Sequence, residues 1–203
     1  MKDNNNNSKQ VLLSVLGVAI LVVAVVGVSF AAFTYSKTGE RVNTITTGTI
    51  TMSYSEPVNG INLVDALPIT DESGKKLNGT NEYFDFTVSA DIAGTTTINY
   101  AITATKENDS TIPDTGVKVY LTNMDSSADT QILEPTLVSA LPKTSSDESG
   151  APDGQYLLED DSFSATGEHS YRLRMWVDGN YTAPATKQTY KLRVNVYGRA
   201  DAQ

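Results

Sequence analysis

Residues 11–33 form a predominantly apolar segment without a single charged side chain. At a helical rise of about 1.5 Å per residue, a helix of this length spans roughly the hydrocarbon core of a bilayer. The sequence that follows is rich in Thr and alternates between apolar and polar side chains. The apolar segment therefore divides the chain into a leader that enters a membrane and a domain that folds beyond it.

Two interpretations of the leader remain open. A secretory signal peptide needs a basic start and small residues before the cleavage site, and Ser29 and Ala31 occupy positions −3 and −1 if cleavage falls before Ala32. An uncleaved anchor through residues 11–33 fits the length better, because the apolar region of a signal peptide has only about 7 to 15 residues. In either case residues 1–31 are a signal peptide or membrane anchor, and we expect the domain to be secreted or displayed at the cell surface.

Composition excludes several classes of function. The formal net charge of −9 argues against nucleic acid as a partner of the domain. The chain has no cysteine, which rules out a disulfide framework and a thiol nucleophile. Its single histidine, His169, follows Glu168 and is interpreted as a surface residue; one histidine cannot build a His-Glu-x-x-His zinc site. We therefore predict a protein that is not an enzyme and has no cofactor.

Alternation of apolar and polar residues dominates the rest of the chain. Phe84, Phe86 and Val88, for example, fall on one face of an extended segment, as a half-buried strand requires. The same pattern predicts strands at residues 49–55, 83–92, 98–104, 117–121, 171–177 and 190–196. No long stretch after residue 33 has helical periodicity. The expected fold is all-β, an antiparallel β-sandwich of jelly-roll-like or immunoglobulin-like type that is preceded by an N-terminal apolar helix.

Two stretches, residues 71–81 and 139–161, have the composition of loops. The second is long, and a loop of that length is usually either mobile or functional. Its carboxylates Glu159, Asp160 and Asp161 are weak candidates for binding Ca²⁺, a cation that prefers oxygen ligands. They match no calcium-binding motif, so solvated loop acids are the favoured interpretation and no metal site is predicted.

Trp176 lies on the outward face of its predicted strand, together with Arg172 and Arg174. Its indole ring is therefore either packed under a loop or sheet edge, or presented to a partner such as a sugar. Packing is the favoured interpretation.

Two motifs resemble a known family. The first is Phe30-Ala31-Ala32-Phe33 followed by Thr47-Gly48-Thr49-Ile50-Thr51-Met52, and the second is the strand Tyr171-Arg172-Leu173-Arg174-Met175-Trp176-Val177-Asp178. Together they resemble the beginning and end of the mature domain in the TasA/camelysin family of Gram-positive exported matrix-fibre proteins. The resemblance implies a jelly-roll-like domain, removal of residues 1–31 by a dedicated (SipW-type) signal peptidase, and self-association into biofilm-matrix fibres.

In the fibre-forming relatives, the mature N-terminal segment completes the sheet of the next subunit, which is β-strand addition. The resemblance places this donor strand at residues 32–47 and the β-sandwich domain at residues 48–203. The implied anchors of the donor are Phe33, Tyr35, Val42 and Ile45. The same segment also fits a flexible stalk. The alternative is then a monomeric β-sandwich that an uncleaved leader holds to the membrane and that binds a sugar, Ca²⁺ or a protein.

Overall fold

The structure is a computed structural model that describes residues 34–38, 45–47, 50–55, 62–64, 66–79, 82–145, 149–184 and 186–200. The chain divides into two compact units, residues 1–34 and 35–203, and the described strands belong to the second apart from Thr34. Within the described residues, no helix is long and apolar enough to cross a membrane. The predicted apolar helix of the leader lies outside them.

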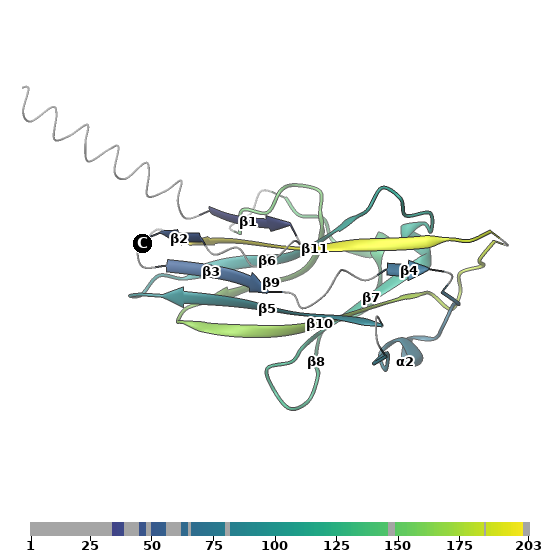
Figure 1. Ribbon diagram of the computed structural model, residues 1–203, viewed down its shortest axis with the longest axis horizontal. Coiled ribbons are helices and arrows are strands. Elements are labelled where there is room, and N and C mark those ends of the chain that lie inside the picture. Colours follow the sequence, from purple (N-terminus) through teal and green to yellow (C-terminus); the bar gives the residue numbers. More distant parts are fainter. Residues whose placement is uncertain are drawn as a thin grey trace, which may run out of the picture. The chain divides into compact units, whose positions relative to one another are not determined.

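Two antiparallel sheets make up the fold (Figure 1). Sheet I has the order β1 (Thr34–Thr38), β11 (Thr189–Ala200), β6 (Ile98–Lys106) and β9 (Tyr156–Phe163), and β4 (Asn62–Val64) also pairs with β11. Sheet II has the order β2 (Ile45–Thr47), β3 (Ile50–Ser55), β5 (Tyr83–Ile92), β10 (Gly167–Val177), β7 (Val117–Asn123) and β8 (Thr130–Leu137). The prediction of an all-β fold is confirmed.

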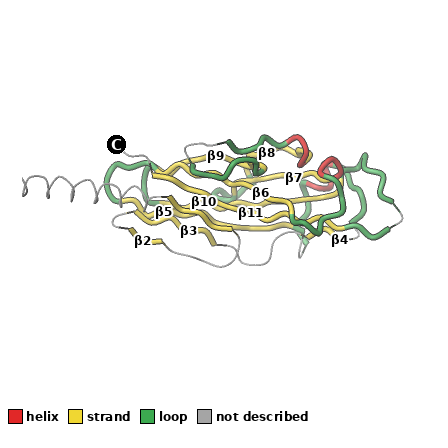
Figure 2. The backbone as a smooth tube through the Cα atoms, turned by 90° about the horizontal axis from the view of Figure 1, so that it is seen from above, coloured by secondary structure: helices red, strands yellow, loops and turns green. Residues whose placement is uncertain are grey.

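Helical structure in the described chain is confined to single turns at the ends of the strands (Figure 2). These are α2 (Asp71–Gly74), η1 (Asp114–Gly116) and η2 (Val138–Ala140). Thr70 caps α2, because its Oγ1 accepts the Ser73 N–H at 3.3 Å. The stretch predicted as a simple surface loop at residues 71–81 therefore begins with a capped helical turn.

The core lies between the sheets and includes the alternating apolar residues that the sequence predicted. Phe84, Phe86 and Val88 of β5 are buried, as are Ile98 and Ile102 of β6. Burying a side chain of this size contributes about 1.5–3 kcal/mol to stability. These residues face those of β10 and β11 in one continuous cluster, so a single core holds both sheets together.

The acidic region predicted as a loop at residues 139–161 is corrected by the structure. Residues 156–163 form β9, which pairs with β6 across a register shift between Ile102 and Thr103. That irregularity breaks the alternation in β9 and hides the strand from periodicity. The described residues 149–155 that precede β9 cover part of the outer face of sheet I, where Ala151 packs with Ala101 and Tyr197.

Gln155 fixes this covering segment to the sheet. Its Oε1 accepts a hydrogen bond from Thr103 Oγ1 at 2.5 Å, and its Nε2 donates to Tyr197 Oη at 2.8 Å. Asn195 Nδ2 donates to the same Oε1 at 3.2 Å. Gln155 therefore anchors this part of the acidic region through partly buried polar contacts.

Candidate functional site: sheet edges and the His169 cluster

The two described strands of the segment predicted to act as a donor lie at the edges of the two sheets. β1 is the end strand of sheet I and pairs with β11, whereas β2 is the end strand of sheet II and pairs with β3. Tyr35 belongs to β1, and Ile45 of β2 lies opposite Met52. The other implied anchors, Phe33 and Val42, lie outside the described residues, as do Ser29, Ala31 and Ala32 of the predicted cleavage site. In this structure the N-terminal strands are paired within their own chain.

Among the described residues, one edge of β11 is paired only with short strands of the same chain. β6 occupies the opposite edge, where the Thr189 and Lys191 carbonyls accept hydrogen bonds from the residues that follow β6. Successive residues of a strand direct their backbone groups to alternate edges. The backbone N–H and C=O of Tyr190 therefore point to the other edge, toward β4. β4 and β1 therefore share this edge of β11. The twelve-residue strand is covered there by a three-residue and a five-residue strand.

The end strands on the other side of the sandwich carry features that oppose strand addition. β8 contains Pro135 and has two register shifts against β7. β9 carries Glu159, Asp160 and Asp161 in succession. Proline, bulges and charged side chains are the devices by which edge strands avoid further pairing. β8 and β9 are thus the protected edges of the two sheets.

The three weak calcium candidates do not form one ligand set. They are consecutive residues of a strand, so Asp160 faces the opposite side of β9 from Glu159 and Asp161. Burial, followed by repulsion from the other two carboxylates, raises the pKa of Glu159 above its usual value. In the part of the chain that the structure describes, no three His, Asp or Glu side chains are placed to hold a metal ion.

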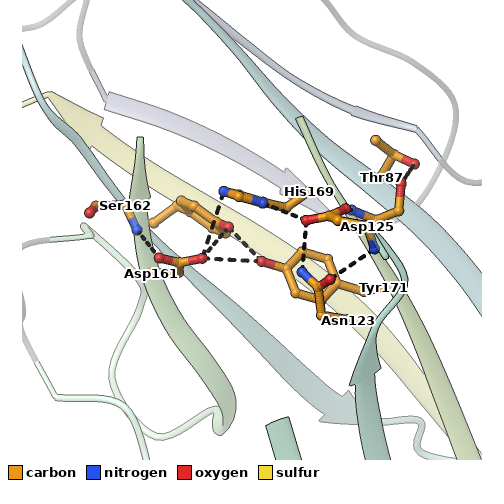
Figure 3. A network of polar contacts seen from close by, with 9 residues as sticks. Thr87, Asn123, Asp125, Asp161, Ser162, His169 and Tyr171 are labelled. Carbon is orange, nitrogen blue, oxygen red and sulfur yellow. Dashed lines mark hydrogen bonds and ion pairs between the residues drawn. The ribbon is translucent and has the colours of Figure 1, made fainter. Parts of the chain in front are cut away.

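Asp161 instead belongs to a polar cluster that joins the two sheets, named here the His169 cluster (Figure 3). Its members are Tyr100 and Asp161 from sheet I, His169, Ser170 and Tyr171 from β10 of sheet II, and Asn123 and Asp125, which lie at the end of β7 and in the turn after it. The two tyrosines meet between the sheets, with their hydroxyl oxygens 2.6 Å apart. Both hydroxyls also lie near Asp161 Oδ2, Tyr100 at 3.0 Å and Tyr171 at 3.5 Å, so the two phenol protons are shared among three contacts.

The single histidine lies between two carboxylates of this cluster. His169 Nδ1 is 2.7 Å from Asp125 Oδ2, and Nε2 is 4.0 Å from Asp161 Oδ2. The imidazole ring also stacks on Phe163, with ring centroids 4.7 Å apart. The sequence predicted a surface histidine; the side chain is one-third exposed and holds specific partners. Sequence separation concealed them, since Asp125 precedes His169 by 44 residues.

The charge states in the cluster follow from burial and hydrogen bonding. Burial raises the pKa of Tyr100 far above its usual value, and the hydrogen bond with Tyr171 acts in the same direction. Burial acts to raise the pKa of Asp125 as well, but hydrogen bonds from the Ser170 N–H, His169 and Asn123 outweigh it and lower that pKa. The Tyr100 phenol is therefore held in its neutral form, whereas Asp125 is held as a carboxylate by its hydrogen-bond donors.

Trp176 is buried, as the favoured interpretation predicted, and only 2 % of its surface is exposed. Its ring lies beneath α2, where a Cβ on Gly74 would come within 2.3 Å of the indole. The neighbouring arginines are also paired within the chain. Arg172 holds both oxygens of Asp85, and Arg174 donates to the Leu77 carbonyl and to Asp129. The indole face is thus closed to a sugar ligand.

The chain matches no model of a known protein family and no curated protein.

Proposed function

We propose that this protein is an exported structural protein whose copies join into extracellular, biofilm-matrix fibres by β-strand addition. One observation carries the proposal: β1, directly after the apolar leader, is a five-residue end strand on the twelve-residue β11. An extended segment can add to the edge of a sheet through main-chain hydrogen bonds, and a second copy of the chain carries the same N-terminal strand. The resemblance of the two sequence motifs to the TasA/camelysin family supports the same function.

Exchange of β1 between copies needs no new kind of contact. A strand that leaves its own β11 and pairs with the β11 of a neighbour forms the same hydrogen bonds in the new position, as in domain swapping. Each copy then donates one strand and receives one. Because the donating and receiving surfaces differ, the contact is heterologous, and it extends into an open chain of subunits where its rotation does not close a ring.

The protected edges support growth in one direction. Pro135 and the register shifts of β8, and the three acids of β9, oppose pairing on the side away from β1. Strand addition is then directed to the edge of β11 that β1 and β4 share. We expect linear fibres of stacked subunits rather than broad sheets.

The partners under this proposal are other copies of the chain and the signal peptidase that removes residues 1–31. The function is structural, without catalysis or a cofactor. The His169 cluster fits this view, because its histidine faces carboxylates and its tyrosines are buried between the sheets. The alternative is the membrane-anchored monomeric binding module, and the experiment below separates the two.

The test compares purified residues 32–203 with a variant that lacks residues 32–47 and with Phe33→Asp. We expect electron microscopy and light scattering to show filaments of residues 32–203, and none of the deletion variant or of Phe33→Asp. Burial of a phenylalanine contributes about 2–3 kcal/mol, so a charge at position 33 should abolish each contact while the thermal stability of the domain stays nearly unchanged. Phe33→Leu is the matched control and should still form filaments.

Two results would contradict strand addition. Filaments that persist without residues 32–47 would show that another surface joins the subunits. A lack of filaments from all four proteins, together with full-length chain in the membrane fraction, would favour the anchored binding module.

A further inference from the structure

The turn between α2 and β5 contains the dipeptide Asn78-Gly79, and both residues are exposed. One carboxylate oxygen organises this turn. Glu82 Oε2 accepts the backbone N–H of Gly79 at 2.6 Å and that of Asn78 at 3.0 Å. The Glu82 N–H in turn donates to the Gly79 carbonyl at 3.1 Å.

An asparagine that precedes glycine is chemically vulnerable. The backbone nitrogen of the glycine attacks the side-chain carbonyl carbon of the asparagine and forms a new C–N bond. The original C–N bond of the side-chain amide breaks, and its nitrogen leaves as ammonia. Water then opens the resulting five-membered imide to aspartate or isoaspartate, so one water is consumed for each ammonia released. Glycine favours the attack because it has no Cβ to obstruct the ring and few restrictions on its backbone.

We propose that Asn78 is a deamidation site whose reaction Glu82 restrains. The attacking nitrogen must lose its proton, and in this turn that proton lies in a short hydrogen bond to a carboxylate. Hydrogen bonds to an ionised acceptor are roughly twice as strong as neutral ones. Removal of the proton would break this bond and would place a negative nitrogen beside a negative carboxylate, which raises the barrier.

The product carboxylate would have a partner already in place. Arg172 Nη1 donates to Asn78 Oδ1 at 3.3 Å, while its Nε and Nη2 hold Asp85. Conversion of the amide to an acid would place a second carboxylate next to this guanidinium, and opposite charges at that separation attract. The restraint is therefore kinetic, because the surroundings of Asn78 accept the charged product.

The experiment follows deamidation by peptide mapping and mass spectrometry during incubation of the purified protein at neutral pH. Two variants, Glu82→Ala and Glu82→Gln, are compared with the wild type. The chain contains a second Asn-Gly pair, Asn59-Gly60, which serves as an internal reference in the same digests. Thermal unfolding of each variant verifies that the domain is folded.

We expect Glu82→Ala to deamidate at Asn78 about tenfold faster than the wild type. A tenfold change corresponds to about 1.4 kcal/mol, which lies near the lower end of the contribution of a hydrogen bond to a charged group. Glu82→Gln should fall between the two, because a neutral amide oxygen accepts a weaker bond. The rate at Asn59 should be the same in all three proteins.

The proposal is overturned if Asn78 reacts in Glu82→Ala at the wild-type rate or more slowly; the slower result would mean that Glu82 acts as a base. It is also overturned if the rate at Asn59 rises as much as the rate at Asn78, which would indicate general loosening of the domain.

Discussion

At the scale of single residues, the polar contacts between the sheets are the least expected feature of this sandwich. Sandwich cores are formed chiefly by inward-facing apolar side chains, yet the hydroxyls of Tyr100 and Tyr171 meet between the layers here. Burial of these groups is tolerated because the two hydroxyls hydrogen-bond each other and both lie near Asp161 Oδ2. The histidine and Asp125 extend the contacts toward the surface.

Asp125 is predicted to make stability depend on pH. Its folded pKa lies below the unfolded value of about 3.9, so its contribution is present above that value and is lost as the pH falls through the folded pKa. We expect Asp125→Asn to be less stable by about 1 kcal/mol at neutral pH, a figure reduced for the one-third exposure of the side chain. Urea unfolding at a series of pH values should show that the free energies of unfolding of wild type and Asp125→Asn become equal as the pH falls from neutral to strongly acidic.

Glu134→Gln is the control for this change, because it removes one carboxylate from the partly exposed edge strand β8. A surface substitution of this kind changes stability by no more than about 0.5 kcal/mol. A constant difference between wild type and Asp125→Asn across the acidic range would contradict the role given to Asp125.

At the scale of elements, α2 is a single helical turn that packs on the outer face of sheet II, over Trp176. A helix this short has little stability of its own and depends on packing. Gly74 permits the contact, because only a residue without Cβ lets the turn approach the ring of Trp176 this closely.

Gly74→Ala should therefore destabilise the domain by about 1–3 kcal/mol, the usual effect of forcing an extra carbon into a packed site. The chain has one tryptophan, so a change in its fluorescence would report directly on this contact. Lys76→Ala, an exposed position just after α2, is the control and should leave both properties unchanged. An unaltered urea midpoint and spectrum in Gly74→Ala would mean that α2 does not rest on the indole.

The elements that sequence reasoning identified are those whose alternation is regular. β5 has the bounds that the pattern predicted, and β6, β10 and β11 extend the predicted segments by a few residues. β9 was missed because its register shift and its consecutive acids break the alternation of apolar and polar residues. β8 was missed because Pro135 interrupts it. The His169 cluster could not be predicted, since its residues come from strands of different sheets that only the fold brings together.

At the scale of the whole molecule, the two ends of the described chain lie in neighbouring strands, β1 and β11. Removal of the leader would give β1 a free N-terminal end, which strand exchange between copies requires. The first step that must be verified is therefore the position of cleavage.

We predict that the protein recovered from culture medium begins at Ala32, because Ser29 and Ala31 supply the small side chains that a signal peptidase accepts. Intact mass spectrometry measures this directly. Ala31→Phe should block cleavage and leave the full-length chain in the membrane fraction, whereas Lys37→Ala, beyond the site, should be processed normally. Recovery of the wild type only as an uncut membrane protein would contradict the prediction.

The order of strands along the chain sets the order in which they find partners. β1 is the first described strand to be synthesised, and its neighbour β11 is the last. Folding of such a long-range pair is slow, because a large loop must close before the contact forms. Every newly made copy therefore passes through a period in which β1 has no neighbour of its own. Under the proposed strand addition, this is the period in which β1 would pair with the β11 of another molecule.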